Sequence, residues 1–201
     1  MDYRRAQTPG GTCFFTVNLA DRDSDTLVRH LEALRTAMTT VREAHPFKLL
    51  AMVVLPEHLH AIWRLPAGDA NFALRWSLIK ADFSRSLPRS ETISPSRQSK
   101  RERGIWQRRY WEHQIRDEID LERHIDYIHY NPVRHGWVKQ PTDWPHSTLH
   151  AYIERGIVAA DWGRSGSVEL GWWGWGSGGV GLREAQPNLP RYLACANRRL
   201  G

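Results

Sequence analysis

The sequence predicts an α+β fold, a β-sheet with helices packed against it. Segments rich in aromatic and β-branched residues, which favour strands, occupy residues 13–19, 47–54 and 58–63. Apolar side chains recur at helical spacing in residues 24–44, 71–87 and 117–130. A chain of 201 residues is long enough for one well-buried core but short for a second. We therefore expect one domain over residues 1–163, followed by a tail.

The first part of the chain alternates extended and helical segments. Residues 1–10 form a polar arm that ends in a turn-forming Thr-Pro-Gly-Gly run, and strand 13–19 follows. Helix 24–44 is stopped by Pro46. Because proline cannot donate to a strand ladder, Pro56 predicts an edge position, a bulge or a break between two strands.

The second part of the chain contains a predicted loop and two further helices. Residues 88–104 are Ser-rich and basic without apolar periodicity, so we expect a mobile loop. Helix 117–130 has acidic residues in its first turn, and Pro132 predicts that it ends near Asn131. A short helix at 147–155 precedes the tail, residues 164–201, which is rich in Gly and Trp and which we expect to be poorly ordered.

Charge and aromatic content indicate a nucleic-acid partner. The formal net charge is +6, and ten tryptophans are present. Cations interleave with aromatic rings in two segments, a pattern that suits single-stranded DNA. The candidate DNA contacts are Tyr3, Arg4 and Arg5 on the arm and Trp106, Arg108, Arg109 and Trp111 before the third helix. The alternatives are a solvated basic arm and tryptophans that belong to the core.

Composition also bounds the compartment. The two cysteines are too few for a disulfide framework, and no apolar run is long enough to cross a bilayer. The start of the chain lacks the apolar region of a signal peptide. We therefore expect a cytoplasmic protein without a membrane partner.

Two histidines on the strand at 58–63 are the candidate metal ligands. His58 and His60 are two apart, so both side chains point to one face while Leu59 points to the other. With an oxygen from an amide or carboxylate, two imidazoles can hold a divalent ion such as Mg²⁺ or Mn²⁺. A lone histidine on an apolar strand more often lines the sheet, but a pair in a basic chain favours a metal site.

The third helix offers a tyrosine and an amide on one face. Tyr127 and Asn131 are four residues apart and therefore neighbours on the helix surface. A tyrosine hydroxyl near a bound cation can become a nucleophile toward phosphate, and the product is a phosphotyrosine link. Tyr130 is the competing candidate.

These features together resemble the REP-associated tyrosine transposases, a branch of the HUH single-tyrosine transposases, in which U stands for a hydrophobic residue. The resemblance rests on an ordered set of motifs over roughly residues 1–163: YRR at 3–5, GGT at 10–12, FFTVNL at 14–19, VVLPEH at 53–58, HLH at 58–60, IWQ at 105–107, WEH at 111–113, DYIHYNPVRHGWV at 126–138 and DWP at 143–145.

The resemblance implies an antiparallel RRM-like or ferredoxin-like sheet, with the histidines on a central strand and the tyrosine on a helix beside it. It implies a metal-dependent endonuclease and strand transferase, which cuts single-stranded DNA next to REP-like hairpins through a 5′-phosphotyrosine and leaves a free 3′-OH. The nucleophile then falls on Tyr127 rather than Tyr130, and the third metal ligand on Asn131. We expect a monomer rather than a dimer.

Two rival functions remain open from the sequence. A protein on the same fold could bind DNA hairpins as a regulator without cutting them. A metal-dependent phosphodiesterase that activates water would not need Tyr127 at all. The presence of the histidine pair together with Tyr127 favours the transposase.

Overall fold

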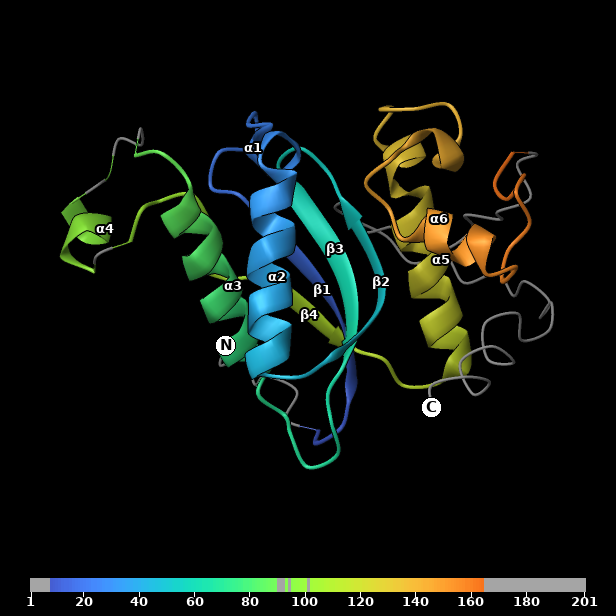
Figure 1. Ribbon diagram of the computed structural model, residues 1–201, viewed down its shortest axis with the longest axis horizontal. Helices are drawn as coiled ribbons and strands as arrows, with labels where there is room; N and C mark the ends of the chain where they lie inside the picture. Colours follow the sequence, from blue (N-terminus) through green and yellow to red (C-terminus); the bar gives the residue numbers. More distant parts are fainter. Residues whose placement is uncertain (1–7, 90–92, 94, 101, 165–201) are drawn as a thin grey trace, which may run out of the picture.

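A four-stranded antiparallel sheet with helices on both faces forms the body of the molecule (Figure 1). The computed structural model describes residues 8–89, 93, 95–100 and 102–164. The arm residues Tyr3, Arg4 and Arg5 and nearly all of the predicted tail therefore lie outside the described residues. The α+β class predicted from the sequence is confirmed.

The strands follow a ferredoxin-like order. They are β1 (Thr12–Asn18), β2 (Lys48–Val54), β3 (His58–Arg64) and β4 (Trp111–Gln114), arranged β2-β3-β1-β4. Every neighbouring pair is antiparallel. Pro56 lies in the turn between β2 and β3, where Leu55 N–H donates to the His58 carbonyl at 2.8 Å. Of the three positions that Pro56 predicted, the break between strands is therefore the one observed.

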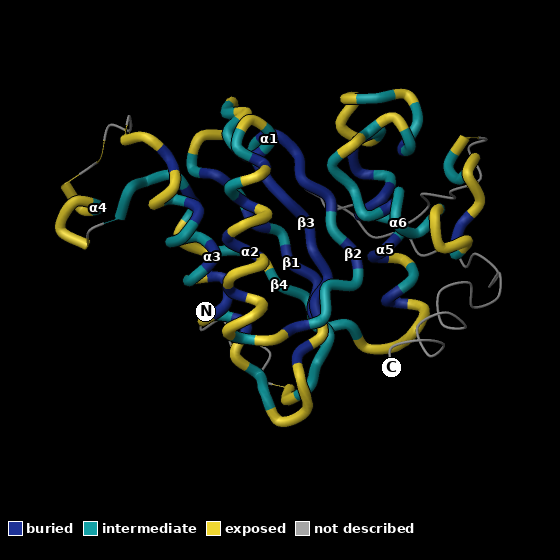
Figure 2. The backbone as a smooth tube through the Cα atoms, in the orientation of Figure 1, coloured by how far each residue is buried: buried dark blue, intermediate teal, exposed yellow. Residues whose placement is uncertain are grey.

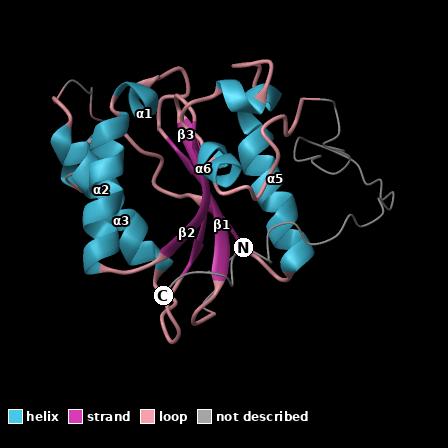
Figure 3. Cartoon of the chain, turned by 45° about the vertical axis from the view of Figure 1, so that its right-hand side comes forward, coloured by secondary structure: helices cyan, strands magenta, loops and turns pink. Residues whose placement is uncertain are grey.

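Two helical layers sandwich the sheet (Figure 3). On one face lie α1 (Thr26–Arg29), α2 (Leu31–Ala44) and α3 (Phe72–Ser86). On the other lie α5 (Glu118–Arg134), the 3₁₀ helix η1 (Pro141–Asp143) and α6 (Leu149–Glu154). The short helix α4 (Pro95–Ser99) falls within the predicted loop and lies away from the sheet. The single helix predicted over 24–44 is in fact two helices that meet at His30.

Alternation along the central strands separates two cores. Phe15, Leu59 and Trp63 point to the α2/α3 side, where the Trp63 ring stacks 4.1 Å from Phe47 and 4.1 Å from Trp76. Phe14 and Ile62 point to α5. Both central strands are thus buried on two faces (Figure 2). A side chain on the α5 face lies between sheet and helix, away from bulk water.

Helix α5 continues through Pro132, which corrects the expected end near Asn131. Its start is as the acidic first turn predicted, with the Asp117 side chain accepting from Asp120 N–H at 2.8 Å. Pro132 lies in the last turn, where its missing N–H removes one hydrogen bond and leaves the rest of the helix intact. His135 N–H still reaches the Asn131 carbonyl at 3.0 Å. Asn131 is therefore helical and stays one turn from Tyr127.

The outer edge of β2 is covered by the segment before α6. Val54 N–H donates to the His146 carbonyl at 2.9 Å, and Met52 N–H donates to Thr148 Oγ1 at 2.9 Å. Thr148 N–H donates in turn to the Met52 carbonyl at 2.9 Å. The polar backbone groups of this edge strand are thus paired within the chain. Within the described ranges, each helix is too short or too polar to span a membrane.

Candidate active site

The predicted histidine pair faces α5 from the centre of the sheet. His58 and His60 are each 3% exposed, and their ring centroids lie 4.9 Å apart. Leu59 between them packs into the opposite core. The strand therefore presents both imidazoles to one face, as the alternating pattern predicted.

Each imidazole is oriented by a neighbour at Nδ1. The Nδ1 of His60 lies 2.9 Å from Thr16 Oγ1 on β1, and the Nδ1 of His58 lies 2.8 Å from Glu57 Oε1. Partners at Nδ1 fix a ring so that Nε2 can act as a ligand. Burial lowers the pKa of His58 and holds the pKa of His60 well below its usual range. Both rings are thus neutral at pH 7, the form that binds a metal.

Asn131 is a fully buried amide on the facing helix. Neither its Oδ1 nor its Nδ2 has a hydrogen-bond partner among the described residues, and the same holds for His60 Nε2. A buried polar group without a partner costs about 1–3 kcal/mol, so a ligand bound by these groups would offset that cost. An imidazole nitrogen and an amide oxygen are suitable donors for a divalent cation.

The four-residue spacing along α5 places Asn131 opposite the histidine pair. The Tyr127 ring lies 5.1 Å from His60 and the His135 ring lies 5.2 Å from His58. Because residues 127, 131 and 135 are four apart, Asn131 lies between these two contacts on the same helix face. Two buried histidines and one buried amide therefore converge on one region between β3 and α5.

Tyr127, and not Tyr130, contacts this region. Tyr127 is half-buried, its ring lies 5.8 Å from Phe14, and the Arg134 guanidinium lies 5.5 Å from its centroid. The Tyr130 ring instead lies beside Gly163, 3.7 Å from where a Cβ on that glycine would stand. The half-exposed hydroxyl-bearing side chain beside His60 is thus Tyr127.

Phe14 is a shared neighbour that the sequence analysis did not single out. Its ring stacks on His60 at 5.4 Å and lies 4.9 Å from His124 and 5.6 Å from Trp111. Phe14 and Thr16 are two residues apart on β1, so their side chains point to the same face of the sheet. Once the pairing of β1 with β3 is known, this places Phe14 on the same face as His58 and His60. One aromatic side chain thus packs under both the histidine strand and the tyrosine helix.

Glu57, Arg134 and His135 were also missed. Glu57 binds His58 as described and lies 3.5 Å from Arg22. His135 follows Asn131 by four residues, a spacing that could have assigned it to the same helix face had Pro132 not predicted an earlier end. Trp137, just beyond, is 51% exposed and lies 6.1 Å from Trp144.

The predicted DNA contacts fall in three classes. Trp111 is 36% exposed at the start of β4, and Arg109 is exposed beside it. Arg108 is exposed but paired with Glu102 at 2.8 Å. Trp106 is only 8% exposed and packs on Phe83 at 5.3 Å, so the expectation of a stacking surface is corrected to a core position.

Comparison with known proteins identifies relatives of the chain. No family model matches it. The REP-associated tyrosine transposase of Escherichia coli K12 is 46% identical over 161 residues, covering 80% of this chain and 90% of that protein. A Haemophilus influenzae protein assigned to the same group is 42% identical over 170 residues, covering 84% and 97%.

A solved structure supports the same relationship. It is a REP-associated tyrosine transposase bound to a REP hairpin, with a TM-score of 0.70 and 46% identity over 81% of this chain and 90% of that chain. The two chains therefore share their fold as well as nearly half of their aligned residues. The chain therefore belongs to the REP-associated tyrosine transposases, a family of enzymes.

Proposed function

We propose that this protein cleaves and rejoins single-stranded DNA beside REP-like hairpins, with Tyr127 as the nucleophile. The single observation that carries the proposal is the position of the half-buried Tyr127 ring 5.1 Å from His60, whose Nε2 lacks a partner among the described residues. The related structure bound to a REP hairpin supports the choice of DNA substrate.

The reaction conserves the energy of the phosphodiester bond. The Tyr127 hydroxyl loses its proton and its oxygen attacks phosphorus, while the bond from phosphorus to the 3′ oxygen breaks and that oxygen takes up a proton. The products are a 5′-phosphotyrosine on the protein and a free 3′-OH on the DNA. Attack by a 3′-OH on the phosphotyrosine reverses the step and rejoins a strand.

His58, His60 and Asn131 would hold a divalent ion, Mg²⁺ or Mn²⁺. When bound, such an ion withdraws charge from the scissile phosphate and orients it. Arg134 over the Tyr127 ring adds a fixed positive charge close to the nucleophile. Trp111, Arg109 and the arm residues Tyr3, Arg4 and Arg5 are the proposed contacts to the rest of the strand.

Covalent trapping tests the nucleophile. A labelled single strand that carries a REP-like hairpin and its flanks should become attached to the wild-type protein and move with it on a denaturing gel. Tyr127→Phe removes one oxygen and keeps the ring, so the adduct should disappear while folding and hairpin affinity change little. Tyr130→Phe is the matched control and should keep the adduct.

Other outcomes separate the rival functions. Cleavage by Tyr127→Phe without any adduct would mean that water is the nucleophile. Hairpin binding by the wild-type protein with neither cleavage nor adduct, in Mg²⁺ and in Mn²⁺, would identify a regulator that does not cut.

Removal of the ion tests the ligands. EDTA, or His60→Ala, should abolish cleavage and leave hairpin binding largely intact, because binding rests on phosphate neutralisation and base stacking. Undiminished cutting after chelation would rule out the metal assignment.

A further inference from the structure

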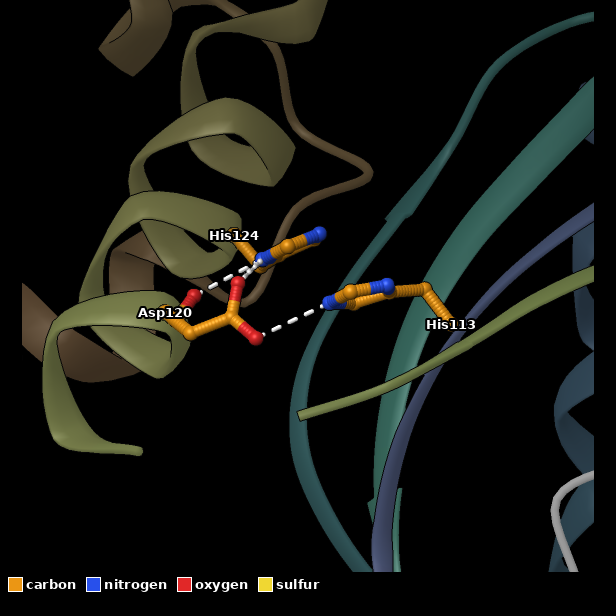
Figure 4. Close-up of side chains that lie close together, drawn as sticks. All are labelled: His113, Asp120 and His124. Atoms are coloured by element: carbon orange, nitrogen blue, oxygen red, sulfur yellow. Dashed lines mark hydrogen bonds and ion pairs between the residues drawn. The ribbon is translucent and has the colours of Figure 1, made fainter. Parts of the chain in front are cut away.

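A second group of ligand-type side chains lies on the same side of the sheet, with Phe14 between His124 and His60. His113 on β4 and Asp120 and His124 on α5 place one ligand atom each within 4.8 Å of one another (Figure 4). His113 Nε2 lies 2.9 Å from Asp120 Oδ2, and His124 Nδ1 lies 3.1 Å from Asp120 Oδ1. One carboxylate thus faces two imidazoles, one at each oxygen.

We propose that His113, Asp120 and His124 form a second metal site, which binds a Zn²⁺-type ion and ties β4 to α5. Two histidines and one carboxylate are a common ligand set for zinc and similar transition metals. This proposal does not depend on the DNA chemistry proposed above.

The ligand atoms lie close enough to converge on one ion after small movements. Ligands that bind Zn²⁺ at 2.0–2.2 Å lie roughly 3.3 Å from one another. The separations of 2.9 and 3.1 Å involve different oxygens of Asp120, so one ion would take both oxygens or draw the two imidazoles, whose ligand atoms lie within 4.8 Å of each other, toward one of them. The two imidazoles stack with planes 12° apart, so their rings must tilt toward the ion. The His113 side chain is 26% exposed, so it is not fully enclosed by other side chains.

An ion at this site requires one proton to move. Burial lowers the pKa of His124, so the ring is neutral at pH 7, and its Nδ1 donates to the Asp120 backbone carbonyl at 2.7 Å. An ion on Nδ1 would shift that proton to Nε2. The pKa of Asp120 is lowered as well, because hydrogen bonds from His113 and from Arg116 N–H outweigh its burial, so the carboxylate is ionised. The Arg116 N–H bond, 3.0 Å from Oδ2, orients the carboxylate and can persist with an ion present.

The Arg116 guanidinium also contacts the carboxylate. Its Nε lies 3.3 Å from Asp120 Oδ2, but the side chain is 76% exposed. Exposed ion pairs contribute little stability, so the Arg116 side chain can move into the solvent at a small cost in stability when an ion binds.

The location gives the site a consequence for the fold. The His113 ring stacks on Trp111 at 5.9 Å, and the His124 ring packs on Phe14. Tyr127 follows His124 by one helical turn. An ion here would fix the strand that carries Trp111 to the helix that carries Tyr127.

Binding to a protein that lacks the first histidine pair isolates the second site. Untagged, full-length His58→Ala/His60→Ala protein, dialysed against EDTA and then against buffer, would be titrated with ZnCl₂ by calorimetry. We expect one equivalent of Zn²⁺ to bind. At a hundredfold excess over Kd, the melting temperature should rise by about 4 °C or more.

Substitution within the second site separates a metal site from a hydrogen-bonded cluster. Asp120→Asn on this background keeps the shape and a hydrogen-bonding oxygen but loses the charge. It should weaken Zn²⁺ binding by more than about 100-fold, since even partners outside the coordination shell are worth 10–100-fold. His30→Ala, between α1 and α2 on the other face of the sheet, is the matched control and should bind as its parent does.

Two results would overturn the proposal. One is the absence of a one-equivalent transition in the His58→Ala/His60→Ala protein whose circular dichroism is native. The other is equal Zn²⁺ affinity with and without Asp120→Asn. Either would leave the three residues as a hydrogen-bonded tie between β4 and α5. If the double variant does not fold, wild-type protein serves instead: two equivalents that fall to one in Asp120→Asn support the site, and one equivalent in both excludes it.

Discussion

At the scale of single residues, the proposed role of Asn131 as a metal ligand predicts a stability cost in the metal-free protein. Its Oδ1 and Nδ2 have no partner among the described residues, and the side chain is fully buried. Replacing a buried unpaired polar group by an apolar one of similar branching removes its desolvation penalty. In EDTA, Asn131→Leu should therefore raise the free energy of unfolding, by about 1 kcal/mol, while metal-dependent cleavage is lost.

Urea unfolding measures this change, and repeating it with Mn²⁺ gives the contrast. Added Mn²⁺ should stabilise the wild-type protein more than Asn131→Leu. A loss of more than about 1 kcal/mol in EDTA would show that the amide is already paired in the metal-free protein.

His129 makes stability depend on pH. Burial lowers its pKa to about 3, and its Nε2 lies 3.1 Å from Thr148 Oγ1. Between pH 6.5 and 3 the unfolded chain takes up a proton that the folded protein refuses, so stability falls as pH falls through this window. Each pH unit costs up to about 1.4 kcal/mol for this group.

The prediction is a shallower pH dependence in His129→Gln. The free energy of unfolding, measured in urea at pH 7.0, 6.0 and 5.0, should decline less steeply below pH 6.5 than in the wild-type protein. Other buried histidines with lowered pKa values, such as His60, act in the same direction, so some slope should remain. An unchanged slope would contradict the assignment to His129.

At the scale of elements, the Thr148 hydroxyl is one of several groups that tie the start of α6 to β2. Thr148 Oγ1 accepts from Met52 N–H at 2.9 Å, donates to the Met52 carbonyl at 3.1 Å, and lies near His129 Nε2. Thr148→Val keeps the shape and leaves buried groups unpaired, so it should lower the free energy of unfolding by about 1–3 kcal/mol. Thr148→Ser keeps the hydroxyl and should cost less. Equal losses in the two variants would mean that the methyl group, not the hydroxyl, matters.

Most of the helices, and the face shared by the two histidines, could be predicted from the sequence alone. Apolar periodicity predicted α2, α3 and the body of α5, and alternation predicted that His58 and His60 share a face, because these signals are local. Strand β4 was not predicted. Its four residues mix aromatic, acidic and basic side chains, and only pairing with β1 makes them a strand.

Long-range packing accounts for the other differences. Trp106 lies in a segment whose sequence is basic and aromatic. It nevertheless forms a β-bridge with Leu19, and its side chain packs in the core. The cluster of His113, Asp120 and His124 joins a strand and a helix whose approach no local pattern encodes. Pro132 led to a wrong helix end because the loss of one N–H does not end a helix whose later N–H groups, such as that of His135, still bond.

At the scale of the whole molecule, positive charge should govern DNA affinity. The net charge of +6 implies counterion release on binding, so hairpin affinity should fall steeply with salt. Arg109→Gln should weaken binding and reduce the slope of log K against log salt by about 1, as expected for one lost phosphate contact.

Arg29 provides the matched control, because it is paired with Asp25 at 2.5 Å on α1, far along the chain from the proposed DNA contacts. Arg29→Gln should change neither the affinity nor the slope. Fluorescence anisotropy of a labelled hairpin between 50 and 200 mM salt measures both, and identical slopes for all three proteins would remove Arg109 from the interface.

The strand order has a consequence during synthesis of the protein. Strands β1, β2 and β3 with α2 and α3 are complete well before the ribosome reaches β4 and α5, which join the sheet last. Tyr127 follows His60 by about 70 residues, a delay of roughly 3–14 s at 5–20 residues per second. Throughout that interval the nascent chain carries the histidine pair without the proposed nucleophile. A product released before α5 would hold the proposed metal ligands of β3 and yet be unable to form the proposed phosphotyrosine link to DNA.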